Sequence, residues 1–182
     1  MLRDIQGQAG RLVALVDDLL TVGKIESDKL NLHKVTFNPK TLIENIVRDF
    51  QQGSATHKIV ISGTLSYPVR ADKELITQVF INLLTNAVKY SPRADKVLVR
   101  IARLKNKCVI SIQDFGSGIA KKDQKDIFTR FFRASDAGAG NVSGLGLGLY
   151  ISKGIIKKHH ERLWVKSIEG KGTTLFFTLS LA

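Results

Sequence analysis

Residues 78–90 read QVFINLLTNAVKY. A helix through this stretch, turning by about 100° per residue, places four side chains on one face: Asn82, Asn86, Lys89 and Tyr90. An amide carbonyl suits a hard cation such as Mg²⁺, an ammonium group suits phosphate oxygens, and an aromatic ring packs against a nucleobase. The stretch therefore predicts a helix that forms one half of a nucleotide site.

The length and composition are those of one soluble globular domain with an appendage. The chain has 182 residues, of which 43% are hydrophobic. It contains no run of 18 apolar residues and no apolar leader, so we expect no membrane segment in this chain. The single cysteine, Cys108, lies in the apolar run CVISI, which excludes a disulfide framework and favours a reducing compartment and a small buried thiol.

The formal net charge of +12 is compatible with a polyanionic partner such as nucleic acid. However, the basic residues are spread among acidic ones, and no aromatic stripe accompanies them. The dispersed set comprises Lys121, Lys122, Lys125, Lys153, Lys157, Lys158, Arg162, Lys166 and Lys171. The charge therefore favours a solvated basic surface or an acidic protein partner, and we expect no nucleic-acid partner.

Apolar residues near the N-terminus recur at spacings of three and four, as in the seam of a coiled coil or helical bundle. They are Leu2, Ile5, Ala9, Leu12, Val16 and Leu19, and the pattern fails at Gly23. This narrow stripe favours a long bundle-type helix that associates with another helix, over an amphipathic helix packed on its own domain. We expect residues 1–34 to form this helix and a polar linker, and residues 35–182 to form a second domain.

The second domain alternates predicted strands and helices. Strands are expected at residues 58–62, 68–71, 97–104, 108–112, 162–167 and 174–181. Helices are expected from Pro39 to about residue 50 with Asn38 as the cap, after a cap at Asp72, and from about residue 147 to 158. This order predicts an α/β fold of the α+β type, a two-layer sandwich in which one mixed sheet is covered by helices.

Two glycine-rich strings follow. QDFGSGI, residues 113–119, places a carboxylate at the end of a strand, where it can accept a hydrogen bond from an exocyclic amine such as that of adenine. SGLGLGL, residues 143–149, opens a helix and offers backbone amides to phosphate. Alone, the first string equally fits an Asx turn. A dinucleotide fold fits the second string poorly, because a loop precedes it and no suitably spaced acidic residue follows.

In this order, the three strings closely resemble the N, G1 and G2 boxes of sensor histidine kinases. Residues 127–133, IFTRFFR, look like the F box of that family, and residues 170–173, GKGT, look like its last glycine turn. The resemblance covers nearly the whole chain and implies the Bergerat fold, with helices on one face of the sheet, shared with gyrase B, heat-shock chaperones and mismatch-repair ATPases. The segment DDLLTVGKIESDKL, residues 17–30, is similar to the second helix of the family's dimerisation and phosphotransfer hairpin.

The resemblance also implies roles for individual residues around ATP and Mg²⁺. Asn86 would hold Mg²⁺ with support from Asn82, Lys89 would meet phosphate, and Tyr90 would flank the base. Asp114 would receive the adenine amine, and Arg133 would contact the terminal phosphate, so that the catalytic roles fall to Asn86, Lys89 and Arg133. The other implied cofactor-binding residues are Gly116, Gly118, Ile119, Gly144, Leu145, Gly146, Leu147, Gly148 and Thr173. Residues 134–143 would be a lid over ATP.

Single residues of these strings also fit structural roles. An exposed lysine such as Lys89 is ordinarily only solvated, and Tyr90 fits a half-buried core position. For Phe128, Phe131 and Phe132, which have helical spacing, we favour packing over nucleotide contact.

Asn82 separates two branches of the superfamily. Hydrolytic members that resemble gyrase B carry a glutamate at this position, which can act as a general base on water. A neutral amide cannot take a proton at pH 7, so the sequence favours phosphoryl transfer over hydrolysis.

We find no phosphoacceptor in the chain. The histidines are His33, His57, His159 and His160. His160 and Glu161 superficially match the His-Glu pair that begins the family's phosphoacceptor motif, but they follow the last helix. His159 aligns with a family histidine that two glycines follow, and His160 and Glu161 stand in place of those glycines. The acceptor histidine is expected on the first helix of the hairpin, outside this chain, so the chain alone should not autophosphorylate.

The resemblance implies the ATP-binding catalytic domain of a sensor histidine kinase. Its γ-phosphoryl acceptor would be a histidine, and a response-regulator aspartate would take the phosphoryl group next. The parent would form a homodimer through the helical hairpin and be membrane-anchored, with this part on the cytoplasmic side. Two alternatives are a nucleotide-gated interaction module without productive transfer and, less favoured, a clamp ATPase of the same superfamily.

Overall fold

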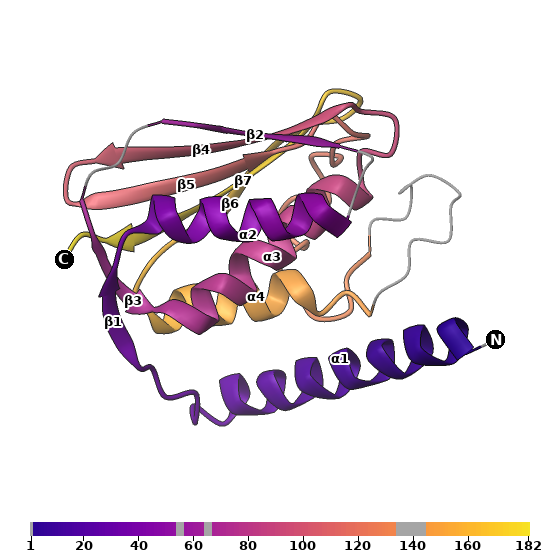
Figure 1. Cartoon of the computed structure of the whole chain (residues 1–182), viewed down its shortest axis with the longest axis horizontal. Coiled ribbons are helices and arrows are strands. Elements are labelled where there is room, and N and C mark those ends of the chain that lie inside the picture. The colour runs from indigo at the N-terminus through magenta and orange to yellow at the C-terminus, as the bar shows by residue number, and fades with distance from the viewer. Residues whose placement is uncertain (1, 54–56, 64–66, 134–144) are drawn as a thin grey trace.

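The computed structural model describes residues 2–53, 57–63, 67–133 and 145–182. In these ranges the helices are α1 (Leu2–Glu26), α2 (Pro39–Gly53), α3 (Lys73–Lys89) and α4 (Gly148–Lys158). The strands are β1 (Lys34–Phe37), β2 (Lys58–Ser62), β3 (Val69–Asp72), β4 (Lys96–Leu104), β5 (Lys107–Gln113), β6 (Leu163–Ile168) and β7 (Gly172–Ser180). Figure 1 shows that α2, α3 and α4 form one layer and the long strands the other, as the sequence predicts.

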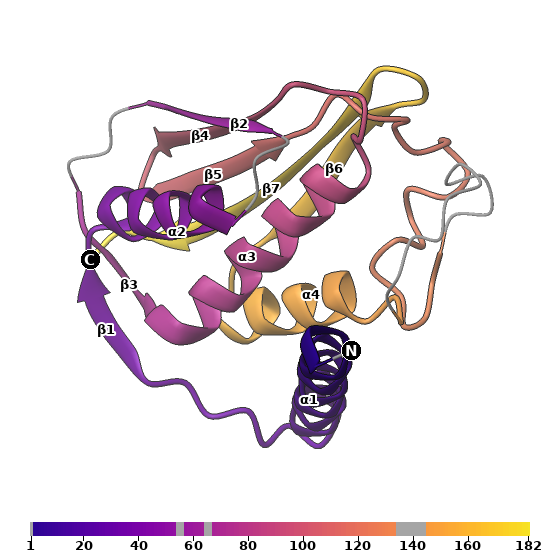
Figure 2. The same ribbon diagram turned by 45° about the vertical axis from the view of Figure 1, so that its right-hand side comes forward.

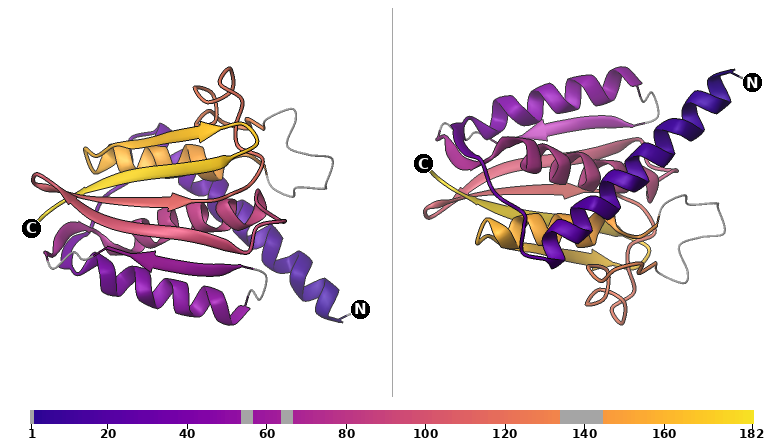
Figure 3. Two further views of the ribbon diagram at one scale, coloured as in Figure 1. Left: turned by 90° about the horizontal axis from the view of Figure 1, so that it is seen from above. Right: turned by 90° about the horizontal axis from the view of Figure 1, so that it is seen from below.

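The main sheet has five strands in the order β2-β4-β5-β7-β6. The pair β2–β4 is parallel, whereas β4–β5, β5–β7 and β6–β7 are antiparallel, so the sheet is mixed. The helices cover only one face of this sheet, and the other face is open in the view from above (Figure 3, left). The predicted two-layer sandwich is therefore confirmed.

The expectation of a single sheet is wrong in one respect. β3 does not join the main sheet but pairs antiparallel with β1, with Lys34 opposite Asp72 and Phe37 opposite Val69. The sequence analysis placed no strand at residues 34–37, a strand of four residues of which three are exposed.

Alternation along the central strands explains why they form the core. In β4 the side chains of Val97, Val99 and Ile101 are buried, and in β5 those of Ile110 and Ile112 are buried. Because successive side chains of a strand point to opposite faces, these residues all meet the helices. Cys108 lies among them as expected, and burial raises the pKa of its thiol to about 12, which keeps it protonated and unreactive.

Two helix starts depend on the predicted side-chain caps. Asn38 Oδ1 accepts hydrogen bonds from the backbone N–H groups of Lys40 at 2.9 Å and Thr41 at 3.3 Å. Asp72 Oδ1 accepts from Leu75 N at 3.1 Å and starts α3. Both side chains satisfy amides that would otherwise lack a partner in the first turn.

The first helix packs against α4 (Figure 2), and the buried side chain that it contributes, among those the structure describes, lies in its C-terminal part. Val22 is buried there, whereas Leu12, Val16 and Leu19 remain exposed. The helix continues to Glu26, past the expected break at Gly23. No helix in the described part of the chain is long and apolar enough to cross a membrane.

Candidate functional site

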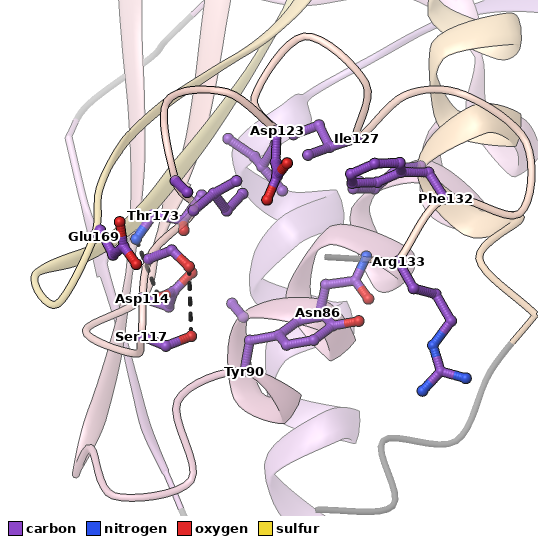
Figure 4. Close-up of a pocket in the computed structure, with 16 residues that line it drawn as sticks. Asn86, Tyr90, Asp114, Ser117, Asp123, Ile127, Phe132, Arg133, Glu169 and Thr173 are labelled. Carbon is purple, nitrogen blue, oxygen red and sulfur yellow. Dashed lines mark hydrogen bonds between the residues drawn. The ribbon is translucent and has the colours of Figure 1, made fainter. Parts of the chain in front are cut away.

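A pocket with a volume of about 140 Å³ opens where β5 and α3 end (Figure 4). Its polar residues come from α3, from the loop after β5 and from the turn into β7. The predicted site residues that line it are Asn86, Tyr90, Asp114, Gly118, Ile119, Arg133 and Thr173. The fold thus brings together residues from segments that lie up to 87 positions apart in the sequence, the difference between 173 and 86.

Asp114 is the most constrained acid of the pocket. Only 6% of its surface is exposed, and its Oδ1 accepts hydrogen bonds from Gly116 N at 2.9 Å and Thr173 N at 3.1 Å. Within the described part of the chain, no hydrogen bond reaches Oδ2, and this oxygen is not sealed from solvent. Burial raises the pKa of Asp114, while the backbone hydrogen bonds act in the opposite direction. The carboxyl group therefore offers one fixed oxygen to the fold and one open oxygen to a ligand.

Gly116 allows the loop after β5 to approach the end of α3. A Cβ atom at this position would lie 1.9 Å from the backbone oxygen of Tyr90. No side chain fits such a gap, so glycine at this position holds Asp114 and Tyr90 on facing walls of the pocket.

A hydroxyl network supports the opposite wall. Ser167 Oγ accepts a hydrogen bond from Ile119 N at 2.8 Å and lies 3.0 Å from Thr173 Oγ1. Gln124 Nε2 donates to the backbone oxygens of Ile119 and Ser167 at 2.9 and 3.0 Å. The sequence analysis missed Ser167 and Gln124, since neither belongs to a recognisable string and both act only after the strands are paired.

The C-terminal end of α3 carries the cationic part of the site. Asn86 and Tyr90 lie side by side there, and Arg133 approaches from the loop before α4 (Figure 4). Partial burial, followed by the charge of Arg133, lowers the pKa of Lys89. Burial raises the pKa of Tyr90, and Arg133 opposes that rise. Two cations this close together at one edge of the pocket make a favourable place for an anionic group.

Asn82 lies one turn before Asn86 but does not line the pocket. Its Nδ2 donates a hydrogen bond to Ser152 Oγ on α4 at 2.8 Å. A Cβ atom at Gly148 would lie 2.2 Å from Asn82 Oδ1, so the first residue of α4 is pressed against this amide. Asn82 therefore fixes the start of α4 relative to α3, and Ser152 is a third residue that the sequence analysis missed.

The last glycine-rich string is only partly brought to the pocket. Leu147 is buried in the core, Leu145 is exposed, and neither these leucines nor Gly146 and Gly148 line the pocket. Leu149, which belongs to the string but was not among the predicted site residues, does line it. Gly144 and the expected lid at residues 134–143 lie outside the described residues.

The three phenylalanines of residues 127–133 have different environments. Phe128 is buried in the core, as expected. Phe132 is half-buried against the core and also lines the pocket. The expectation of packing is wrong for Phe131, which is 56% exposed and has a positive φ of 59°. The described segment forms turns rather than a helix, so helical spacing does not place the three rings on one face.

Apolar side chains form a further wall of the pocket. Ile127, Phe132, Leu149 and Leu175 line it, and such a surface suits a flat aromatic base. Two further acids, Asp123 and Glu169, lie at its rim. No group of three or more His, Cys, Asp or Glu side chains suited to a metal ion occurs among the described residues. The only predicted metal ligand in the pocket is therefore the amide of Asn86.

Comparisons with known proteins agree with this geometry. The family model described as "Histidine kinase-, DNA gyrase B-, and HSP90-like ATPase" matches residues 71–182. The chain is 34% identical over 178 residues to sensor histidine kinase WalK of Bacillus subtilis and 38% identical over 176 residues to sensor protein kinase WalK of Staphylococcus aureus. The structure of Acinetobacter baumannii histidine kinase AdeS superposes with a TM-score of 0.81 at 27% identity, covering 99% of this chain and 83% of that one.

The matches cover 96% and 93% of this chain, but only 29% and 41% of the two WalK proteins. The chain thus corresponds to a part of these relatives, the part that holds the ATP-binding fold. It belongs to the histidine kinase-, DNA gyrase B- and HSP90-like ATPase family, and its fold is that of the ATP-binding catalytic domain of a sensor histidine kinase.

Proposed function

We propose that the chain binds Mg·ATP in the pocket at the end of β5. Within its parent protein it would transfer the γ-phosphoryl group to a histidine on another segment, from which an aspartate of a response regulator takes it. The observation that carries this proposal is the state of Asp114, whose Oδ1 is held by two backbone amides while Oδ2 remains open to the pocket. A carboxylate oxygen fixed in this way is suited to accept the exocyclic amine of adenine.

The remaining predicted residues fit the other parts of the nucleotide. Tyr90 and the apolar wall would hold the base, and Lys89 and Arg133 would hold phosphate oxygens. The donor set for Mg²⁺ is a single amide carbonyl, that of Asn86, so the phosphates would supply most of the ligands. Bound Mg²⁺ would neutralise charge on the transferring phosphoryl group.

Asn82 supports transfer to an acceptor over hydrolysis. Its amide is already engaged with Ser152, and an amide has no basic nitrogen or oxygen that could accept a proton from water at pH 7. No step that activates water therefore runs through this position, and the phosphoryl group would pass to a histidine brought by another segment.

The exposed stripe of α1 supports a dimeric parent. Leu12, Val16 and Leu19 are exposed on a helix whose described side chains become buried only near its C-terminal end, at Val22. A second hairpin of the same kind would cover this stripe. Because phosphotransfer needs ATP and a response regulator, we place this part of the parent on the cytoplasmic side.

Calorimetric titration with a non-hydrolysable ATP analogue, with and without Mg²⁺, tests nucleotide binding. A helical fragment bearing the acceptor histidine, added with ATP, then tests transfer through the appearance of acid-labile phosphohistidine. We expect Mg²⁺-dependent binding, phosphorylation of the fragment, and no phosphohistidine on the chain alone.

The possible results separate the proposals. Absence of Mg²⁺-dependent binding would refute the nucleotide site itself. Binding without phosphorylation of the fragment would leave a nucleotide-gated interaction module, and release of free phosphate at a comparable rate would favour an ATPase.

A further inference from the structure

A second hollow lies at the opposite end of the sheet from the nucleotide pocket. It has a volume of about 380 Å³ and is lined by residues from β1, β3, the end of α4 and the last strand. Figure 1 shows β1 and β3 gathered there beside the C-terminus, and an isolated bridge joins Val69 to Leu181. α3 separates the two hollows, since Asp72 caps its first turn and Asn86 lies near its last. Its 17 residues correspond to a length of about 25 Å.

Two cations line this hollow on one face of the small β1–β3 sheet. Lys34 lies opposite Asp72 and Arg70 lies opposite Thr36, so the two are diagonal neighbours in the register. Diagonal side chains on paired strands lie about 7–8 Å apart at Cα. Within the described part of the chain, neither cation forms an ion pair with a carboxylate. Two like charges therefore line the same hollow, and neither is bound to a carboxylate of the described residues.

The carboxylates nearby are already satisfied. Glu161, whose side chain is 3% exposed, accepts hydrogen bonds from Lys107 Nζ at 2.5 Å, Ser180 Oγ at 2.6 Å and Thr178 Oγ1 at 2.6 Å. Asp72 accepts from the backbone amides of His33 at 2.8 Å and Leu75 at 3.1 Å. Neither acid forms an ion pair with Lys34 or Arg70, and Lys107 offsets the charge of Glu161, which lines the hollow.

His159 forms the floor of the hollow and is neutral. Its Nε2 accepts a hydrogen bond from Asp72 N at 3.0 Å, and its Nδ1 donates to Ile155 O at 2.9 Å, which fixes the uncharged tautomer. Burial lowers the pKa of His159, although the hydrogen bond to Ile155 acts in the opposite direction. The positive charge of the hollow therefore comes from Lys34 and Arg70, and the buried ring of His159 adds none.

We propose that this hollow is a binding site for a small dianion, a phosphate group or a dicarboxylate, held between Lys34 and Arg70 with Ser180 as a neutral neighbour. A dianion could contact both cations at once, and the guanidinium of Arg70 offers the paired donors that phosphate and carboxylate oxygens accept. The site is separate from the nucleotide pocket. Because Lys34 is the first residue of β1, directly after the linker from α1, an anion there would also tie the linker end to the domain.

Titration of inorganic phosphate, and separately of succinate, tests this proposal at constant ionic strength. Calorimetry gives the affinity, and amide chemical shifts locate the site. Each titration is made with and without a saturating non-hydrolysable ATP analogue. The test variant is Lys34→Gln with Arg70→Gln. Its matched control is Lys58→Gln with Arg100→Gln, which removes one lysine and one arginine charge from exposed positions of the main sheet.

We expect saturable binding that the analogue does not displace, with shifts centred on residues 34, 70 and 181. The test variant should weaken it about tenfold or more, because charge-assisted contacts are lost, and the control less than about twofold. Binding of phosphate alone would assign a phosphate site, and binding of both anions a general dianion site. Three results would each overturn the proposal. They are displacement of the anion by the ATP analogue, an equal loss of anion affinity in the test and control variants, and no saturable binding of either anion. Thermal unfolding of both variants shows whether they are folded.

Discussion

Replacing Asp114 by asparagine is the most direct test of the nucleotide site. The substitution keeps the size and shape of the side chain, and the amide oxygen of asparagine can still accept from Gly116 N and Thr173 N as Oδ1 does now. The amide nitrogen then replaces Oδ2, the oxygen that is open to the pocket. A donor would therefore face the exocyclic amine of adenine, which is itself a donor.

The expected loss of affinity follows from one hydrogen bond to a charged acceptor. Such a bond contributes about 1.5–3 kcal/mol, which corresponds to a rise in Kd of about 10- to 150-fold. An analogue with guanine presents an acceptor oxygen at the equivalent position, so its Kd should rise less than that of the adenine analogue. The ratio of the two Kd values isolates the contact at the base from any general damage to the site.

The stability of this variant should not fall with its affinity. Burial raises the pKa of Asp114 in the folded chain, so the folded state binds the proton more tightly than the unfolded state. The free energy of unfolding of the wild type should therefore decrease as pH rises from about 4 through the raised folded pKa. Asparagine has no such titration, and at pH 7 we expect the variant to unfold at the same or a higher temperature.

Calorimetric titration of both analogues measures the contact of Asp114 with the base, and thermal unfolding measures the stability of the variant. Asp49→Asn is the matched control, because Asp49 is exposed on α2, far from the pocket, and should leave both Kd values unchanged. An unaltered Kd for the adenine analogue in a folded Asp114→Asn protein would refute the role of Asp114. An equal loss for both bases would assign it a purely structural role.

Three further predictions concern the contacts around α4. Ser152→Ala removes the hydrogen-bond acceptor of the Asn82 amide, and should raise the Kd of the Mg²⁺-bound analogue about fivefold in calorimetry, the equivalent of about 1 kcal/mol. Glu26→Gln weakens the 2.6 Å ion pair with Arg130 that links α1 to the loop before α4. Both side chains are partly exposed, so stability should change by less than about 1 kcal/mol, whereas hydrogen exchange in the last turns of α1 should become faster. His159→Gln should flatten the pH dependence of stability in urea, because a lowered histidine pKa makes the wild type lose stability as pH falls below about 6.5.

Controls and opposing results differ among the three. For Ser152→Ala, the control is Thr77→Ala, which removes a comparable hydroxyl from the exposed surface of α3 and should leave the Kd of the analogue unchanged. An unchanged Kd for Ser152→Ala itself would contradict a role of Ser152 in positioning Asn82. For Glu26→Gln, the control is Glu44→Gln, which loosens an ion pair within α2. Unaltered exchange in α1 would show that the Arg130 contact does not hold the helix. If the free energy of unfolding of His159→Gln still falls as pH drops below about 6.5, groups other than His159 cause that fall.

The elements predicted well from the sequence are those with a local signal. Asn38 and Asp72 were predicted as caps because a capping residue acts within three positions of itself. The strands of the core were predicted because alternation is a property of one segment. β1 was missed because four residues are too short a segment to establish an alternating pattern, and its partner β3 lies more than 30 residues away.

The same distinction applies to the candidate site. Asp114 and Thr173 lie 59 residues apart, and only the resemblance of their strings to a known family placed them together. Ser152 and Ser167 belong to no such string, and their hydrogen bonds to Asn82 and Ile119 appear only in the folded chain. For Phe131, in contrast, the sequence predicted a contact that the fold does not make. Its apolar character and spacing predicted packing, but the backbone turns there with a positive φ and leaves the ring in solvent.

The length of α3 has a mechanical consequence. At its first turn Asp72 is bonded to the linker through His33 and to the end of α4 through His159, and at its last turn Asn86 and Tyr90 form a wall of the pocket. A rigid rod of about 25 Å acts as a lever arm, so a tilt of about 5° at the anchored end moves the far end by about 2 Å. That displacement is comparable to the tolerance of a hydrogen bond. A change at the joint near Asp72 that tilted α3 would therefore alter the geometry at the nucleotide pocket.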